Sequence, residues 1–585
     1  MINKKRTFIS IIIIVGITLL INLPGIKWGL PSDNTIKLIF GDINFLRTIL
    51  PQMIETRAEI RQMIDVPGDQ YYSSYNENRT IEIKYKDEII PLSVGQINAM
   101  RTYLLRTYYP DEHTVIAALS NINVREKKFS PKVLIPGTFY VYISGLWLKI
   151  CDFFNIVRIS QNVDFYLNNS AEMASIYLSL RVFLIIVLCC TVYLTWISVS
   201  KIWDIETGIV SSLLVGISPV LNLWNHFGYY YGFSLPFIIL AFYYSQKILN
   251  DNRLRFYLAS AIASSISSSI VVLYGISFLF LISAIIIVLT HHKTDKEVLK
   301  KIIKNFLVAS IVFIGTFAII HIFLLIDKGT LLKLVRFEQG DFKFSPYFFY
   351  FIFASLKSAC GWPFLLSAIA GYILLITRFR DKNAKFLVTS LIVPFILFSS
   401  FSPWYARRGI FLIPFMAIFA GMFLIWLKKK NRIIGSIILF FVLFYTFLYS
   451  ASYTKIFMEE NIRDIAGKWI NENIPEKTKI GLLQMPAPYR TPPFQFYKYK
   501  LTPISWDKEL LQKEKPEYFI ISEYETLWQT KEQLNDFFSE YEILKYFKKP
   551  ATLLGIKFTR TPLSAKDFWP PNPDIIIYRR KYVER

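Results

Sequence analysis

The feature that most constrains this chain is a series of apolar segments, each close to the ~20 residues needed to cross the hydrocarbon core of a membrane. They fall near residues 7–25, 176–199, 207–224, 229–247, 255–272, 274–290, 304–326, 361–377, 385–402, 409–427 and 433–452. Hydrophobic residues make up 53% of the chain, more than a soluble core can hide. We therefore predict a mainly α-helical, polytopic transmembrane bundle.

Basic loops between the apolar segments predict the orientation, because Lys and Arg concentrate in cytoplasmic loops. These loops are Lys201, 247–255, 291–304, 378–385 and 428–432. All of them are cytoplasmic if two further apolar stretches, 134–151 and 345–360, lie at the outer face without crossing. This arrangement gives about eleven spans, a cytoplasmic N-terminus and an extracytoplasmic C-terminus.

The formal net charge is +23, and most of the short basic clusters lie in these loops between apolar runs, where basic residues contact anionic lipid headgroups. We expect membrane lipid as a partner and no nucleic acid. The four cysteines (Cys151, Cys189, Cys190 and Cys360) lie in or beside apolar stretches and form no CxxC pair. They are predicted to be small core residues, not a disulfide framework or a metal site.

Hydropathy divides the chain into four parts. These are a first transmembrane helix (1–27), an extracytoplasmic first loop with an inserted subdomain and a juxtamembrane helix (28–175), the transmembrane bundle (176–452) and an extracytoplasmic domain (453–585). In the last part, 461–475 is typical of a helix, and KIGLLQM (479–485) and EYFIISE (517–523) are typical of strands. We predict a small α/β domain there, and strands also within 79–92 of the first loop.

The strongest local motif is Tyr108-Tyr109-Pro110-Asp111-Glu112-His113, which precedes a helical run. Proline with neighbouring acids is a good helix start, so a capped helix is one interpretation. The position in the first outer loop favours another. A carboxylate at the membrane surface can deprotonate an acceptor hydroxyl or bind a divalent cation.

Outer-side arginines are a second candidate, because they run against the charge rule. Arg407 and Arg408 follow Tyr405 at the start of an apolar helix, where a guanidinium can hold phosphate in a forked geometry. Arg336 lies in another outer loop and could help. Contact with lipid headgroups is the alternative for each of them.

The layout resembles the GT-C superfamily of polyprenyl-phosphate-dependent glycosyltransferases, particularly its dolichyl-phosphate-mannose protein mannosyltransferase-like branch. The matching elements are Trp28-Gly29-Leu30-Pro31, Pro110-Asp111-Glu112, Phe129 with Pro131, Phe139 to Tyr142, Ser218-Pro219, Arg407-Arg408 with Pro414, and Asp464 to Pro475. The resemblance implies that Asp111 is the catalytic base or a metal-side carboxylate, with Glu112 as its catalytic neighbour. It implies a phosphate clamp at Arg407 or Arg408.

The chain departs from the family pattern at a loop that often carries a second acid. Here that loop is Asn225-His226-Phe227-Gly228-Tyr229-Tyr230-Tyr231-Gly232, without Asp or Glu. Either His226 takes a ligand role beside Asp111 at a divalent metal, or no metal bridged by two carboxylates takes part. An ordinary interfacial histidine is the alternative. We include His113, His226, Tyr231 and Tyr405 with the arginines as substrate contacts.

The expected function is an integral plasma (inner) membrane glycosyltransferase. It would move a mannose-like hexose or a pentose from polyprenyl phosphate to a hydroxyl on a protein or glycolipid. The alternatives are a transporter or flippase of lipid-linked sugars, or a catalytically inactive GT-C-like protein. Sparse charge within the spans favours the enzyme over the transporter.

Overall fold

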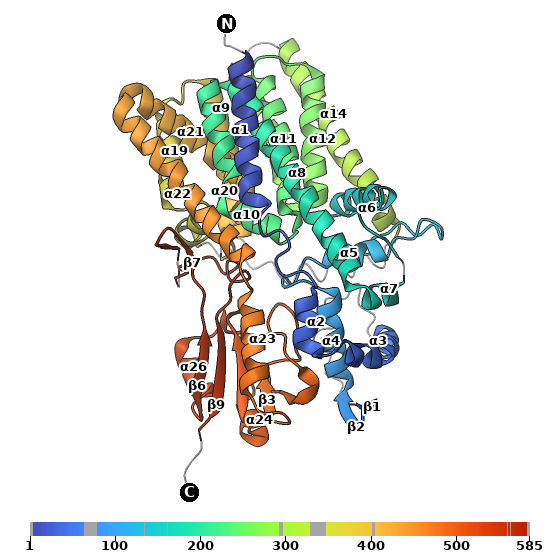
Figure 1. Cartoon of the computed structure of the whole chain (residues 1–585). Helices are drawn as coiled ribbons and strands as arrows, with labels where there is room; N and C mark the ends of the chain where they lie inside the picture. The colour runs from blue at the N-terminus through green and yellow to red at the C-terminus, as the bar shows by residue number, and fades with distance from the viewer. Residues whose placement is uncertain are drawn as a thin grey trace.

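The computed structural model describes residues 4–63, 79–133, 135–160, 162–291, 296–327, 347–400, 404–558, 560–561 and 563–581. Figure 1 shows a bundle of long helices at one end of the molecule and a smaller part that contains both helices and strands (the mixed part) at the other. The two termini lie at opposite ends. The bundle contains α1 (Lys4–Asn22), α8 (Ser170–Ile202), α9 (Ile205–Gly216), α10 (Pro219–His226), α11 (Leu235–Ile248), α12 (Leu254–Ile270), α13 (Phe278–His291), α14 (Lys296–Ile320), α19 (Trp362–Thr377), α20 (Lys382–Ser400), α21 (Ile413–Lys430) and α22 (Arg432–Met458).

The predicted transmembrane bundle is confirmed as an arrangement of apolar helices. Among the described residues, six helices are long and apolar enough to cross a membrane, or up to eight if each of two bent helix pairs is one span. The predicted spans 7–25, 229–247 and 255–272 form α1, α11 and α12, which are not in that set. Two of these helices are short, with 14 residues in α11 and 17 in α12. The count of about eleven therefore stays a prediction.

The two stretches predicted to lie at the outer face do not form straight spans. Residues 134–151 correspond to α6 (Thr138–Phe153), which is 16 residues long and lies at the end of the bundle nearest the mixed part (Figure 1). The second stretch is described from residue 347 on, and within 347–360 short turns of helix follow one another: α17 (Phe348–Tyr350), η4 (Phe351–Leu356) and α18 (Lys357–Cys360). A bend of 119° then leads into α19.

Local sequence explains several helix starts in the bundle. Proline occupies the first turn of α10, α11, α19 and α21, where its missing N–H costs no helical hydrogen bond. Asp204 and Asn431 accept hydrogen bonds from the first-turn backbone of α9 and α22. Helix α21 begins at the end of the 3-10 helix η5 (Ala406–Leu412), which carries the predicted arginine pair.

The first outer loop folds into helices and one hairpin. Its elements are α2 (Asp33–Phe40), α3 (Ile43–Met63), β1 (Thr80–Tyr85), β2 (Glu88–Ser93), α4 (Val94–Leu105), α5 (Thr114–Ser120) and α7 (Val163–Asn168). Strands β1 and β2 pair antiparallel, which confirms the strands predicted in 79–92. The Tyr103 hydroxyl donates to the carbonyl of Thr491 at 2.8 Å, and the Gln96 amide donates to that of Phe496 at 3.1 Å. The loop is thus packed against the C-terminal part.

The C-terminal part contains the predicted small α/β fold. It comprises α23 (Ile462–Asn473), β3 (Lys479–Leu482), β4 (Lys500–Pro503), α24 (Lys508–Glu514), β5 (Tyr518–Ser522), α25 (Glu523–Thr526), α26 (Lys531–Phe537), β6 (Tyr541–Phe547), β7 (Ala551–Leu553), β8 (Ile556–Phe558) and β9 (Ile575–Arg580). The main sheet has the order β4-β3-β5-β9-β6. Strands β4, β3 and β5 are parallel, whereas β9 is antiparallel to both β5 and β6.

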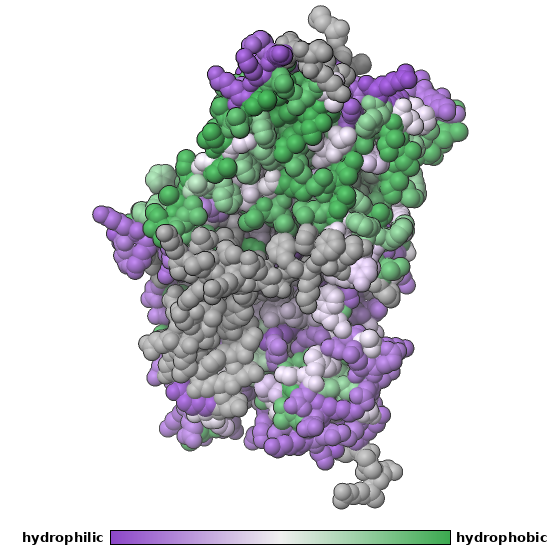
Figure 2. Space-filling model, turned by 180° about the vertical axis from the view of Figure 1, so that it is seen from behind, coloured by the Kyte–Doolittle hydropathy of each residue, from purple (hydrophilic) through white to green (hydrophobic). Residues whose placement is uncertain are grey.

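Surface hydropathy follows this division. Figure 2 shows hydrophobic residues over the bundle, with hydrophilic residues at its far end and over the opposite part of the molecule. Exposed apolar side chains on α14 and α22 include Ile311, Ile319, Ile437 and Phe440, each more than 60% exposed. Such a continuous apolar surface is explained by contact with lipid.

Candidate functional site

A cavity of about 550 Å³ lies where the bundle meets the C-terminal part. Two of the predicted regions line it, the turn before α5 and the start of η5. Its wall consists of Tyr109, Pro110, Asp111, Tyr405, Arg407, Leu483, Gln484, Tyr489, Arg490, Ser505, Trp506, Tyr524, Glu525, Leu527, Trp528, Lys566, Asp567, Trp569 and Pro570. Segments about 300 residues apart in the sequence therefore share one site.

Asp111 is the acidic residue that the first loop supplies to this cavity. Its Oδ2 accepts a hydrogen bond from the Tyr109 hydroxyl at 3.3 Å. Burial raises the pKa of Asp111, while the Arg407 guanidinium and the Tyr109 hydroxyl act in the opposite direction. A carboxylate with a raised pKa is a stronger base than an ordinary surface aspartate, which suits proton abstraction from a hydroxyl.

Arg407 supplies positive charge to the same cavity. Its guanidinium carbon lies 4.2 Å from the ring centroid of Tyr405 and 5.8 Å from that of Trp224. Its Nε is buried and makes no hydrogen bond to any residue that the structure describes. A guanidinium held by aromatic faces, with donors still available, is suited to bind an anionic ligand.

Asp567 from the C-terminal part fixes the backbone at Arg407. Its two carboxylate oxygens accept hydrogen bonds from the backbone N–H groups of Ala406, at 2.8 Å, and Arg407, at 3.0 Å. A third contact runs from the Lys566 backbone N–H to the Trp404 carbonyl at 2.8 Å. The position of the arginine thus depends on a segment far along the chain.

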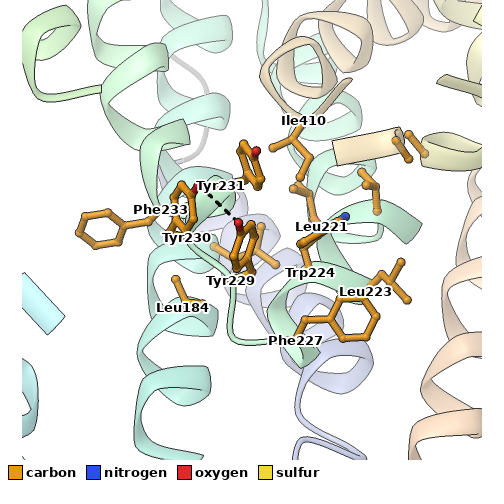
Figure 3. Close-up of a cluster of buried hydrophobic side chains, with 14 of the residues drawn as sticks. Leu184, Leu221, Leu223, Trp224, Phe227, Tyr229, Tyr230, Tyr231, Phe233 and Ile410 are labelled. Atoms are coloured by element: carbon orange, nitrogen blue, oxygen red, sulfur yellow. Dashed lines mark hydrogen bonds between the residues drawn. The ribbon is translucent and has the colours of Figure 1, made fainter. Parts of the chain in front are cut away.

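An aromatic cluster supports the site from the bundle side. Figure 3 shows Trp224, Phe227 and Tyr229–Tyr231 gathered around the end of α10, with a hydrogen bond of 3.5 Å between the hydroxyls of Tyr229 and Tyr230. The Tyr109 ring stacks on Phe227 at 4.4 Å between centroids. Tyr231, predicted as a substrate contact, packs within this cluster and not in the cavity wall. The cluster holds Tyr109 and Trp224 in place.

Glu112, predicted as the catalytic neighbour of Asp111, is absent from the cavity wall and forms an ion pair with Arg181. Its two oxygens each accept a hydrogen bond of 2.7 Å from Arg181, and the two side chains are 1% and 0% exposed. Arg181 also donates to the carbonyls of Ile26 and Trp28. Gly228, with φ of +62°, passes so close that an added Cβ would lie 2.2 Å from a Glu112 oxygen. This carboxylate is enclosed and ties three segments together.

Three of the remaining predicted contacts, His226, His113 and Arg408, are absent from the cavity wall. Both ring nitrogens of His226 lie 2.9 Å from backbone carbonyls, those of Asn222 and Pro24, and its ring stacks on Phe457. His113 is buried at the start of α5, and Arg408 is absent from the cavity lining. Arg336 lies outside the described residues.

A divalent metal at Asp111 and His226 does not fit this geometry. The His226 ring nitrogens both face carbonyls, and no cluster of three or more His, Cys, Asp or Glu side chains suited to a metal occurs in the described ranges. We therefore derive no chemical step through a metal ion.

Sequence reasoning missed the contribution of the C-terminal part. Arg490, Glu525, Lys566 and Asp567 all line the cavity, yet none belongs to a recognisable motif. The one available signal is the run Lys566-Asp567-Phe568-Trp569, in which charged and aromatic residues adjoin within a soluble-looking tail.

Comparisons with known proteins concern the overall structure alone. No family model and no curated protein sequence matches the chain. Among solved structures, the archaeal oligosaccharyltransferase AglB from Archaeoglobus fulgidus, in complex with an inhibitory peptide and a dolichol-phosphate, has a TM-score of 0.44 at 10% identity. That match covers 88% of this chain and 74% of that one.

Two further structures were found. The Archaeoglobus fulgidus oligosaccharyltransferase in complex with Zn and sulfate has a TM-score of 0.42 at 11% identity. That match covers 78% of this chain and 68% of the oligosaccharyltransferase chain. ArnT from Cupriavidus metallidurans bound to undecaprenyl phosphate has a TM-score of 0.41 at 10% identity and covers 82% and 95%. At these TM-scores the likeness assigns no residue and no substrate to this chain.

Proposed function

We propose that this chain is a membrane glycosyltransferase that moves a sugar from a polyprenyl-phosphate donor to an acceptor hydroxyl. The donor sugar would be a mannose-like hexose or a pentose, and the acceptor a protein or a glycolipid. One observation carries the proposal: Asp111 and Arg407 line one cavity at the junction between the apolar bundle and the polar C-terminal part. A lipid-linked phosphate needs both environments at once.

In this mechanism the acceptor oxygen attacks the anomeric carbon while Asp111 takes the proton of its hydroxyl. The bond between the anomeric carbon and the phosphate oxygen breaks, and polyprenyl phosphate leaves with the electron pair. Arg407 offsets the negative charge that grows on the leaving phosphate. A single displacement of this kind inverts the anomeric configuration.

The proposed setting is the plasma (inner) membrane, with the N-terminus in the cytoplasm and the C-terminal part outside. The basic loops of the bundle support this orientation, and the termini lie at opposite ends of the molecule (Figure 1). The cavity would then open at the outer face, where a polyprenyl-phosphate sugar can be reached from the lipid.

The proposal is tested by incubating the purified protein with a panel of polyprenyl-phosphate hexoses and pentoses. We expect release of polyprenyl phosphate from at least one donor when an acceptor hydroxyl is supplied. A parallel series with EDTA asks whether a divalent cation takes part. Movement of the intact donor across a liposome membrane, without release, would instead identify a flippase. Failure to bind any donor would identify an inactive protein.

A further inference from the structure

The C-terminal part contributes its share of the cavity from one edge of its sheet. Strands β4, β3 and β5 are parallel, so their carboxyl ends lie at the same edge. Gln484 and Arg490 follow β3, Trp506 follows β4, and Glu525 and Trp528 follow β5. In parallel α/β sheets, ligands bind at this edge.

The order of the strands indicates more closely where along this edge a ligand binds. The chain goes from β3 to β4 on one side, and then returns to β5 on the other side of β3. The segments that follow β3 and β5 therefore diverge, which creates a crevice between them. Residues 483–490 and 524–528 are the segments concerned, and both provide cavity residues.

Aromatic rings with accessible faces line this crevice. Trp528 is 59% exposed, Trp506 is 37% exposed and Tyr524 is 36% exposed. Tyr489 and Trp569 each lie 5.0 Å from the Tyr524 ring, which holds that ring in a fixed position. Large aromatic surfaces left accessible in a cavity indicate a ligand that covers them.

Polar groups stand beside the rings. The Lys566 ammonium lies 5.0 Å from the centroid of the Trp528 ring and donates one hydrogen bond to the Leu527 carbonyl at 2.6 Å. An ammonium has three donors, so further ones can serve a ligand. Glu525 and Arg490 both line the cavity, where burial raises the pKa of Glu525 and the Arg490 guanidinium opposes the rise.

We propose that this crevice binds a carbohydrate as the acceptor, so that the acceptor hydroxyl belongs to a glycan or a glycolipid headgroup. The assignment of this carbohydrate as the acceptor of a transfer reaction rests on the proposed function. A pyranose ring has an apolar C–H face that packs on tryptophan or tyrosine and a rim of hydroxyls that needs donors and acceptors. The crevice provides both.

One further observation favours a carbohydrate over an extended peptide. A common mode of binding an extended peptide is strand addition along an exposed sheet edge, and the edges of this sheet are β4 and β6, which supply no residue to the cavity wall.

The test uses the full-length purified protein without donor, so that its outcome is separate from transfer activity. Binding of free hexose and pentose oligosaccharides, and of a peptide containing serine and threonine, is followed by intrinsic tryptophan fluorescence and calorimetry. We expect saturable binding of an oligosaccharide, weakened roughly tenfold in Trp528→Leu. Trp362→Leu, which changes an exposed tryptophan on α19, is the matched control and should bind normally.

The proposal is overturned if no oligosaccharide binds, if the peptide alone binds, or if Trp528→Leu binds as the wild type does while its thermal unfolding is unchanged. If donor release is absent from the wild type but sugar binding persists and depends on Trp528, the proposed transfer fails and the carbohydrate site stands.

Discussion

Two neighbouring acids on one turn, Asp111 and Glu112, are each placed near an arginine from a distant helix. Glu112 meets Arg181 in a closed, two-point ion pair with almost no exposed surface. Asp111 meets the field of Arg407 across a cavity, and its side chain accepts a hydrogen bond from Tyr109 alone among the described residues. A fully satisfied pair holds the structure together, whereas an unsatisfied pair beside a cavity can act on a ligand.

The largest expected effect comes from breaking the closed pair. Glu112→Ala leaves Arg181 buried without its partner, a change that typically costs about 3–5 kcal/mol. We expect a strongly lowered Tm and poor accumulation in the membrane, measured by thermal unfolding in detergent. Glu126→Ala, which breaks an exposed ion pair with Lys128, is the control and should change little. An unchanged Tm in Glu112→Ala would contradict a structural role for the pair.

Removing the arginine of the open pair should affect turnover and not folding. Arg407→Ala loses the donors proposed to offset charge on the leaving phosphate, and we expect a fall in kcat of about 100- to 1000-fold. Arg408→Ala changes the adjacent residue, which is absent from the cavity wall, and should stay within a few-fold of wild type. Equal losses in the two variants would show that their charge acts generally and not at the site.

A smaller loss is expected when the support of Arg407 is weakened. In Asp567→Asn one side-chain oxygen can still accept a hydrogen bond, but the other is replaced by an NH2 group that faces a backbone N–H. That N–H then has no acceptor, which costs about 1–3 kcal/mol. Because Asp567 positions Arg407 through its backbone, the acid limb of the pH profile should stay in place while kcat falls by roughly tenfold. A fall in Tm without a change in kcat would limit Asp567 to a structural role.

The smallest effect concerns the pKa of Asp111. The Tyr109 hydroxyl lowers this pKa, so Tyr109→Phe should raise it. A base must be deprotonated, and activity is therefore lost as pH falls through its pKa. We expect the acid limb of kcat/KM to move to higher pH. Tyr243→Phe, far along α11 from the site, should leave the limb in place, and a shift to lower pH in Tyr109→Phe would contradict the assignment.

Much of the fold could be predicted from local sequence. Apolar segments of membrane length became helices, 79–92 became a hairpin, and the tail formed a helix and parallel strands near the expected residues. These features depend on hydropathy, periodicity and turn residues within short windows. The span count is less predictable, because α11 begins only at Leu235, well inside the apolar segment 229–247, and α12 ends at Ile270, before the end of the segment 255–272.

The site was predictable only in part, since its contacts join distant segments. Asp111 and Arg407 stand out locally, as an acid and a cation on the outer side. Nothing near Glu112 in the sequence indicates that its carboxylate pairs with Arg181. Nothing near His226 indicates that the carbonyls of Pro24 and Asn222 face its ring nitrogens. The contact between Asp567 and the backbone of η5 likewise arises only when the C-terminal part folds against that helix.

The most direct test of the central claim is the rate of polyprenyl-phosphate release by Asp111→Asn, measured beside the wild type with the same donor and acceptor. Asparagine keeps the shape of the side chain but cannot take a proton. We expect a loss of about 100- to 10,000-fold in kcat, with donor binding and Tm retained. Turnover within a few-fold of wild type would contradict the role of Asp111 as the base.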